Sequence, residues 1–183
     1  MTDSTRSAVR RNCLLGLRVV VVLSFLLGAA RATLFTVYRV AGASMLTNLV
    51  DGDRIFVYDP PFGQPDIAIG DPVVLEVDGE VLVKRVLAGP GDTIEMVFGN
   101  VVRNGWPLTE HIGVDRRSYD WVPETRLGDD EYFVLGDHRR VSVDSREFGP
   151  VHRAQLLGVV ALRAPLQGGL ARVRDTLVRM PEL

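Results

Sequence analysis

Hydrophobic positions divide the chain into one long continuous run and a later series of short runs. Residues 13–38 are predominantly apolar around every side of a helix, with only Arg18 and Arg31 interrupting them. Beyond this run, short β-branched and aromatic stretches alternate with turn-forming residues, which is typical of strands. The stretches that we predict as strands are 55–58, 73–77, 81–88 and 159–164. The pattern therefore predicts one N-terminal helix followed by a mostly β domain.

The N-terminal run can cross a bilayer, because a membrane-spanning helix needs about 20 apolar residues. The arginines that precede or enter it are Arg6, Arg10, Arg11 and Arg18. By the positive-inside rule, they place the N-terminus in the cytoplasm. A cleaved secretory signal also fits the basic start and apolar core, whereas a buried soluble helix fits poorly because no polar face is present. We favour an uncleaved anchor, since no flexible linker follows the run.

These features predict four segments. They are a cytoplasmic tail over residues 1–12, a transmembrane anchor over 13–38, an extracytoplasmic domain over 39–164 and a C-terminal tail over 165–183. In the tail, apolar residues at 170, 173, 177 and 180 have a helical spacing. We interpret the tail either as a short amphipathic helix at the membrane surface or as a frayed end.

Composition narrows the possible functions. The 183 residues have a net charge of −2, so the overall charge does not favour a nucleic-acid partner. The single cysteine, Cys13, excludes an intramolecular disulfide and a cysteine-based metal site. The histidines, which are His111, His138 and His152, are too scattered to favour a histidine-built metal site. We therefore expect neither a metal nor another cofactor.

Lys84 interrupts the apolar run at 81–88, close to the predicted core. The pair Asp78-Gly79 predicts a hairpin that joins this run to the strand before it. A lysine in such a strand can extend its amine to the surface or pair with a carboxylate. Alternatively, desolvation lowers its pKa and leaves a neutral amine that can act as a general base. The strand alone does not decide between these roles, but a nucleophile elsewhere in the chain would.

Ser44 is the candidate nucleophile. It lies in a bend of small residues, after Gly42 and Ala43 and before the turn signal Asp-Gly-Asp at 51–53. Small neighbours allow another backbone to approach closely and leave backbone N–H groups accessible, which an oxyanion-binding site requires. A serine in a small-residue loop is by default only a loop residue, so its assignment depends on the motifs that accompany it.

The order of these motifs resembles the type I signal peptidase family. The resemblance rests on Gly-Ala-Ser-Met at 42–45, on Lys84-Arg85 followed by Gly-Pro-Gly-Asp at 89–92, and on the box Gly-Asp-His-Arg-Arg-Val-Ser-Val-Asp-Ser-Arg-Glu-Phe-Gly at 136–149. It covers about residues 42 to 151, and the last box is highly specific. It implies an antiparallel, barrel-like β catalytic domain with one N-terminal transmembrane helix. It also implies a serine–lysine endopeptidase of the bacterial plasma membrane that removes signal peptides from exported proteins.

The resemblance implies a role for each matched residue. Ser44 corresponds to the nucleophile and Lys84 to the general base, and Arg85 follows the base as it does in the family. Ser142 corresponds to the serine that accepts a hydrogen bond from the lysine amine. The oxyanion would be bound chiefly by the backbone N–H of Ser44, at a bend formed by Gly42.

Other residues are expected to support the site. The resemblance matches Asp144 and Arg146 to an ion pair near it, and Asp137 and Arg139 to bracing of the loop. The interval that corresponds to residues 99–130 carries a variable insertion in the family and is short here. The residues expected to line small pockets for the substrate are Val40, Met45, Leu82 and Val83.

Three positions depart from the family pattern. After Ser44-Met45 the family usually has a residue and then Pro-Thr-Leu, whereas this chain has Leu-Thr-Asn-Leu at 46–49. Gly42 stands where some members have an oxyanion-hole serine, as it does in other members. His138 replaces the usual asparagine, and we interpret it as a tolerated substitution because Lys84 is intact within its own motif.

The implied partners are the signal peptides of exported preproteins and the lipid bilayer, and we expect a monomer. An extended signal-peptide end would pair with strand edges near 40–43 and 81–83. Two other functions stay open. A self-cleaving repressor of the SOS type shares the serine–lysine pair, but it carries a DNA-binding helix-turn-helix where this chain has its basic and apolar run. The other alternative is a membrane-tethered β domain that has lost catalysis and only binds peptides.

Overall fold

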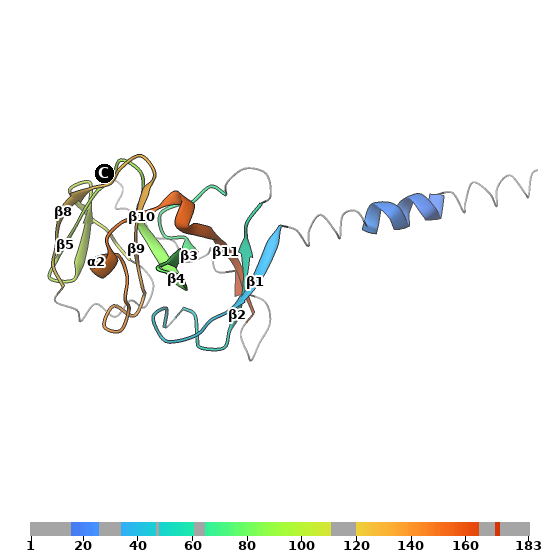
Figure 1. The fold of residues 1–183 in the computed structure, drawn as a ribbon, viewed down its shortest axis with the longest axis horizontal. Helices are drawn as coiled ribbons and strands as arrows, with labels where there is room; N and C mark the ends of the chain where they lie inside the picture. Colours follow the sequence, from blue (N-terminus) through green and yellow to red (C-terminus); the bar gives the residue numbers. More distant parts are fainter. Residues whose placement is uncertain are drawn as a thin grey trace, which may run out of the picture.

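Two antiparallel sheets form the framework of the computed structural model, which describes residues 16–25, 34–46, 48–60, 65–110, 120–164 and 171–172 (Figure 1). The larger sheet has the order β1 (Phe35–Arg39), β2 (Arg54–Tyr58), β11 (Leu156–Ala164), β3 (Pro72–Val77), β4 (Glu80–Ala88), β9 (Glu131–Leu135) and β10 (Val151–His152), and β12 (Ala171–Arg172) pairs with β11. The smaller sheet has the order β7 (Trp106–Pro107), β6 (Asn100–Arg103), β5 (Thr93–Val97) and β8 (Val122–Arg126). A short helix α2 (Ser145–Phe148) and a 3-10 turn (Arg153–Gln155) complete the described elements. The prediction of a mostly β protein is confirmed.

The expected barrel-like form is wrong for the described residues. The larger sheet is open, with β1 at one edge and β10 at the other. Closing a sheet into a barrel requires its two edge strands to pair with the correct stagger. Here β10 has only two residues, and both of them pair with β9.

The predicted helical anchor over 13–38 extends too far, because Phe35–Arg39 form strand β1. This strand pairs with β2 in continuous antiparallel register from Phe35 opposite Tyr58 to Arg39 opposite Arg54. The Phe35 and Tyr58 rings pack at a centroid distance of 5.5 Å. The aromatic and β-branched residues of this segment have the same hydropathy whether they lie in a helix or in a strand, so hydropathy alone did not show where the helix ends and the strand begins.

The N-terminal helix is described over residues 16–25, and its apolar side chains there are exposed. Among the described residues, no helix is both long enough and apolar enough to span a bilayer. The remainder of the predicted 13–34 segment and the tail at 1–12 lie outside the described residues. At the other end of the chain, residues 171–172 form β12, so the helix, which was one of the two interpretations of the tail, is wrong at these two positions. The rest of the 165–183 tail lies outside the described residues.

The interval predicted as an insertion, 99–130, contributes most of the smaller sheet, because β6, β7 and β8 all lie within it. A shared apolar core joins this sheet to the larger one. The members of that core are Leu87, Ala88, Ile94, Met96, Val101, Leu108, Leu127, Phe133 and Leu135. The smaller sheet is therefore packed on the C-terminal half of β4 and on β9, the two strands that lead into the site.

Strand β4 changes partners along its length. It pairs with β3 from Glu80 to Arg85, and with β9 from Arg85 to Ala88. The residues after Val83 are all buried, whereas those before Leu82 are exposed. Lys84 is therefore the last residue of β4 before the pairing with β9 begins at Arg85.

Close backbone packing at Gly158 of β11 generates a stability prediction. A methyl group at this position would lie 2.6 Å from the Tyr58 carbonyl oxygen and 2.7 Å from Val57 Cγ1 of the adjacent strand. We expect Gly158→Ala to lower the free energy of unfolding by about 1–3 kcal/mol, as overpacking typically does. Urea denaturation measures the change. Gly89→Ala is the control, because its methyl group would meet Tyr132 at an ordinary 3.6 Å; equal stability of the two variants would contradict the prediction.

Candidate active site

Lys84 is almost completely buried in β4, with an exposed fraction of 2%. Desolvation in this setting lowers the pKa of the Lys84 amine, because burial penalises the charged form. The charge of Asp144 acts in the opposite direction and raises it, whereas the positive charge of Arg146 lowers it further. The net shift is downward, so the amine is biased toward the neutral form that can accept a proton.

The Lys84 amine has a defined partner. Its Nζ donates a hydrogen bond to Ser142 Oγ at 3.1 Å, and both residues are buried. This is the contact that the resemblance implied between these two residues. Because a lysine side chain is long and flexible, a bond at its end fixes the direction of the amine.

Ser44 begins a tight turn that the core anchors from one side. The Leu49 N–H donates to the Met45 carbonyl at 2.8 Å. Met45 and Leu49 are both buried against the apolar side chains of β2. Ser44 itself is half-buried. The apolar residues that follow Ser44 therefore position its turn, while the serine remains at the margin of the core.

Gly42 shapes the bend before the serine. Its φ of 93° lies in the left-handed region that favours glycine. Its N–H donates to Asp51 Oδ1 at 2.9 Å, so this group is already bonded and is not directed at a developing oxyanion. The Ser44 N–H has no bonded acceptor among the described residues. Of the two residues expected at the oxyanion site, Ser44 is thus the one with an available donor.

Gly136, which follows β9, is in close contact with both the serine turn and the partner of the lysine. A methyl group at Gly136 would lie 2.6 Å from the Ser44 carbonyl oxygen and 2.5 Å from Ser142 Cβ. These separations are too short for any real side chain. The Ser44 carbonyl also accepts the His138 N–H at 3.0 Å. The box that starts at Gly136 therefore brings together the backbone of Ser44 and the hydroxyl that binds Lys84.

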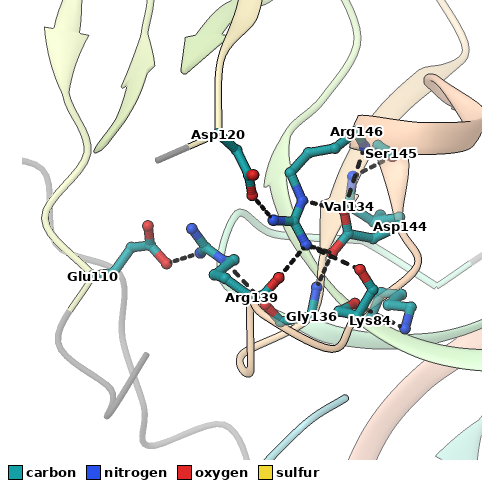
Figure 2. Close-up of polar contacts among 10 residues, drawn as sticks. Lys84, Glu110, Asp120, Val134, Gly136, Arg139, Asp144, Ser145 and Arg146 are labelled. Atoms are coloured by element: carbon teal, nitrogen blue, oxygen red, sulfur yellow. Dashed lines mark hydrogen bonds and ion pairs between the residues drawn. The ribbon is translucent and has the colours of Figure 1, made fainter. Parts of the chain in front are cut away.

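Asp144 and Arg146 form the expected ion pair beside the site. Arg146 Nε lies 2.8 Å from Asp144 Oδ1, and Asp144 is fully buried. The second carboxylate oxygen, Oδ2, accepts the Gly136 N–H at 2.9 Å. Arg146 Nη2 also donates to the Ser142 carbonyl at 3.0 Å. Figure 2 shows the Arg146 guanidinium between Asp144 and Asp120.

A second buried ion pair lies next to Lys84 in the sequence. Arg85 binds Asp137 in a bidentate manner, with Nε to Oδ1 at 2.8 Å and Nη2 to Oδ2 at 2.6 Å. The remaining Arg85 nitrogen, Nη1, donates to the Gly70 carbonyl at 2.7 Å. Asn48 Nδ2 donates to Asp137 Oδ2 at 2.8 Å. One ion pair therefore joins the lysine strand, the box and the serine turn.

The residues expected to line substrate pockets separate into two groups. Val40 and Met45 are buried in one apolar cluster, and Val83 packs against the same cluster. Leu82 packs against a different cluster, which contains Val73 and Leu75 of β3. Neighbouring residues in a strand point to opposite faces, so Leu82 and Val83 cannot share one pocket. The structure thus brings together Val40, Met45 and Val83, and it does not bring Leu82 to them.

The expected set of site residues did not include several that support it. They are Asn48, Glu110, Asp120 and Gly136. Asn48 could have been noticed because it lies in the segment that departs from the family pattern. Glu110 and Asp120 carry no local signal, because their partners, Arg139 and Arg146, are 29 and 26 residues further along the chain.

The arrangement supplies the groups that nucleophilic acyl transfer requires. They are a serine hydroxyl, a buried amine with a lowered pKa and a backbone N–H donor. Within the described ranges, no three His, Cys, Asp or Glu side chains gather in a way that could bind a metal ion.

The sequence is similar to several known proteins. The family described as "Signal peptidase, peptidase S26" matches residues 13–164. Signal peptidase I of Bacillus licheniformis is 34% identical over 152 residues, which cover 76% of this chain and 80% of that protein. Probable signal peptidase I-1 of Synechocystis is 35% identical over 130 residues, which cover 66% of each chain. A crystal structure of a signal peptidase I from Enterococcus faecalis is 25% identical, with a TM-score of 0.47, and covers 54% of this chain and 99% of that chain.

The close approach at Gly136 gives a test of the site geometry. We expect Gly136→Ala to slow acylation of Ser44 by a β-lactam-type probe roughly hundredfold, because displacing a reacting group by about 1 Å has effects of this size. The methyl group has to displace either the Ser44 carbonyl or the Ser142 side chain. Intact-mass spectrometry measures the acylation rate, with Gly89→Ala as the control. Acylation of Gly136→Ala at the rate of the unchanged protein would contradict this geometry.

Proposed function

The chain belongs to the peptidase S26 family of signal peptidases, and on that premise we propose that it is a membrane-bound serine endopeptidase that uses Ser44 and Lys84 to cleave signal peptides from exported preproteins. Family membership makes the protein an enzyme of the signal peptidase type. We assign these two residues chiefly because the Lys84 amine is buried and donates a hydrogen bond to Ser142. The contact of Gly136 with both Ser142 and the Ser44 carbonyl supports it further.

The proposed reaction is acyl transfer in two steps. Neutral Lys84 accepts the hydroxyl proton of Ser44 as the serine oxygen attacks the scissile carbonyl. The Ser44 N–H stabilises the resulting oxyanion. The protonated lysine then donates its proton to the leaving amine, and the C–N bond breaks. Water activated by the same lysine hydrolyses the acyl-enzyme and regenerates the serine.

The charges around Lys84 are arranged so that the amine can stay neutral. Asp144 is a buried carboxylate that by itself would favour the protonated lysine. Arg146 counteracts this effect in two ways. It pairs with Asp144 through Nε and Nη2, at 2.8 and 2.9 Å, and its own charge lowers the pKa of the Lys84 amine. The ion pair therefore allows a structural carboxylate to lie close to a neutral base.

The N-terminal half of β4 offers an edge for an extended substrate. It pairs with β3 on one side, and on the other side the pairing with β9 begins only at Arg85. A peptide could therefore bind along residues 81–84 by strand addition, which uses the unpaired backbone groups of an edge. Val40, Met45 and Val83, which pack in one cluster, would limit the size of the side chains that fit beside the cut.

We extend the proposal to the membrane anchor. The helix described at residues 16–25 exposes a continuous apolar surface, which includes Leu23 and Phe25 at 59% and 74% exposure. Such a surface is stable in a bilayer, where lipid tails contact it. The four arginines at positions 6, 10, 11 and 18 favour a cytoplasmic N-terminus and an extracytoplasmic catalytic domain. We place the end of the anchor before β1, which begins at Phe35.

Removal of either reacting group tests the catalytic pair. We expect Ser44→Ala and Lys84→Ala each to abolish cleavage of a preprotein after an Ala-x-Ala site, with a loss of at least roughly 10³-fold, because the two groups act as a unit. Lys84→Arg should be equally inactive, since arginine stays protonated and cannot act as a base. Cleavage is measured by gel shift with the full-length chain in membranes. Arg140→Ala, at an exposed position of the same box, is the control.

Normal processing by Ser44→Ala or by Lys84→Ala would overturn the assignment. Acylation of Ser44 by a β-lactam-type probe separates an enzyme from a domain that only binds peptides. Such a domain would not show the mass increase of the acyl-enzyme.

The lowered pKa of the amine predicts the pH dependence. Only neutral Lys84 accepts the serine proton, so activity is absent below its pKa and rises as pH increases through it. Because burial lowers that pKa, we expect the midpoint of the rise to lie below the ordinary lysine value of 10.5. Lys84 is the only lysine in the chain, so protein labelled with ¹³C at lysine Cε gives one resonance that reports this pKa directly. A midpoint at the value of free lysine would contradict the proposed base.

A further inference from the structure

Two arginines of the box at 136–149 bind acidic residues that lie next to strands of the smaller sheet. Arg139 Nη2 contacts Glu110, which follows β7, and both side chains are buried. Arg146 Nη1 contacts Asp120, which precedes β8. Figure 2 shows Glu110 pointing toward the Arg139 guanidinium and Asp120 pointing toward that of Arg146. Both acids lie in the interval 99–130, to which no catalytic role was assigned.

Each arginine also donates hydrogen bonds to backbone carbonyls of the loop that lies against Lys84. Arg139 Nε donates to the Gly136 carbonyl at 2.9 Å. Arg146 Nη2 donates to the Ser142 carbonyl at 3.0 Å and to the Arg139 carbonyl at 2.7 Å. The two arginines thus fix both ends of the loop from Gly136 to Ser142. This loop carries the hydroxyl that binds the Lys84 amine.

We propose that Glu110 and Asp120 are positioning residues of the reaction, which act from the smaller sheet through Arg139 and Arg146 to keep Ser142 in place against Lys84. The inference rests on the proposed function of Lys84 as the base. It gives the smaller sheet a mechanical role, because the core shared between the two sheets fixes where these acids lie. An arginine without its outer partner would keep its contacts within the loop but lose its attachment to the rest of the domain.

We expect the charge of Asp120 to act on the amine through Arg146, whose pKa it raises. The charged groups that act on Lys84 are Asp144, Arg146, Asp137 and Glu147 from the box and its helix. Arg85, the next residue on its own strand, is paired with Asp137. Loss of the negative charge of Asp120 leaves the positive charge of Arg146 less compensated. A more positive surrounding disfavours the protonated amine, so the pKa of Lys84 falls.

Asp120 is the residue chosen for the test, because its side chain is 42% exposed and we therefore expect its replacement to leave the fold intact. Glu110→Gln would leave the Arg139 charge buried without its counterion, which is strongly destabilising. The test uses the full-length chain in detergent, labelled with ¹³C at Lys84. Three variants are compared with the unchanged protein: Asp120→Asn, Asp120→Glu and Glu124→Gln. Glu124 is an exposed residue of β8, so its variant has the same change in net charge without the contact to Arg146.

For Asp120→Asn we expect the Lys84 resonance to titrate at a lower pH than in the unchanged protein, with a modest shift because Asp120 is partly exposed and its charge is screened. We expect kcat for preprotein cleavage to fall about five- to tenfold with KM nearly unchanged, since the base is displaced and substrate contacts are retained. Asp120→Glu keeps the charge and should restore most of kcat and the titration midpoint. Glu124→Gln should behave like the unchanged protein.

Two results would overturn the inference. One is an Asp120→Asn protein whose Lys84 titration and kcat equal those of the unchanged protein. The other is a shift of the same size in Glu124→Gln, which would mean that only net charge matters. The failure of the proposed function is a separate result. In that case Lys84→Ala would still cleave preprotein, whereas the titration, which needs no substrate, would still report whether Asp120 acts on the amine.

Discussion

The desolvation of the Lys84 amine is the constraint on which the rest of the site depends. A buried amine is neutral near physiological pH only if the carboxylates around it are compensated, because an unpaired one would favour protonation. Asp144 and Asp137 both act in that direction, and each is paired with an arginine. These pairs are not strong contributors to stability in themselves, since burying them has a large desolvation cost. In the proposed mechanism, their effect is to let a polar loop lie against a neutral base.

The serine and the lysine lie on separate elements, and the contacts that join them are of two kinds. Apolar packing of Met45 and Leu49 fixes the serine turn on β2. Steric contact at Gly136 then sets the distance between this turn and the box, because only a glycine leaves room for both the Ser44 carbonyl and the Ser142 side chain. Packing and steric exclusion have little freedom to adjust, so a small shift in the box would be transmitted to both of the proposed reacting groups.

The sequence predicted the features that depend on local patterns, and it failed where distant segments meet. The strands around Lys84 and the motif residues followed from periodicity and from the resemblance, and the ion pair of Asp144 with Arg146 was expected from the same box. The open sheet, the β1 strand and the contacts of Glu110 and Asp120 depend on which segments lie side by side, which no local pattern encodes. The placement of Leu82 is different, because strand alternation alone could have separated it from Val83.

The missing proline after the serine shows how a tertiary contact can replace a local restraint. A proline restricts a turn through its fixed φ, wherever the turn lies in the fold. Here the Asn48 side chain binds Asp137, and Arg163 of β11 contacts the Asn48 carbonyl. Because Arg85 already compensates the Asp137 charge, a neutral amide can bind this carboxylate without adding an unpaired charge to the buried site. The turn is thereby attached to the same ion pair as the lysine strand, in addition to its own backbone hydrogen bonds and the packing of Met45 and Leu49.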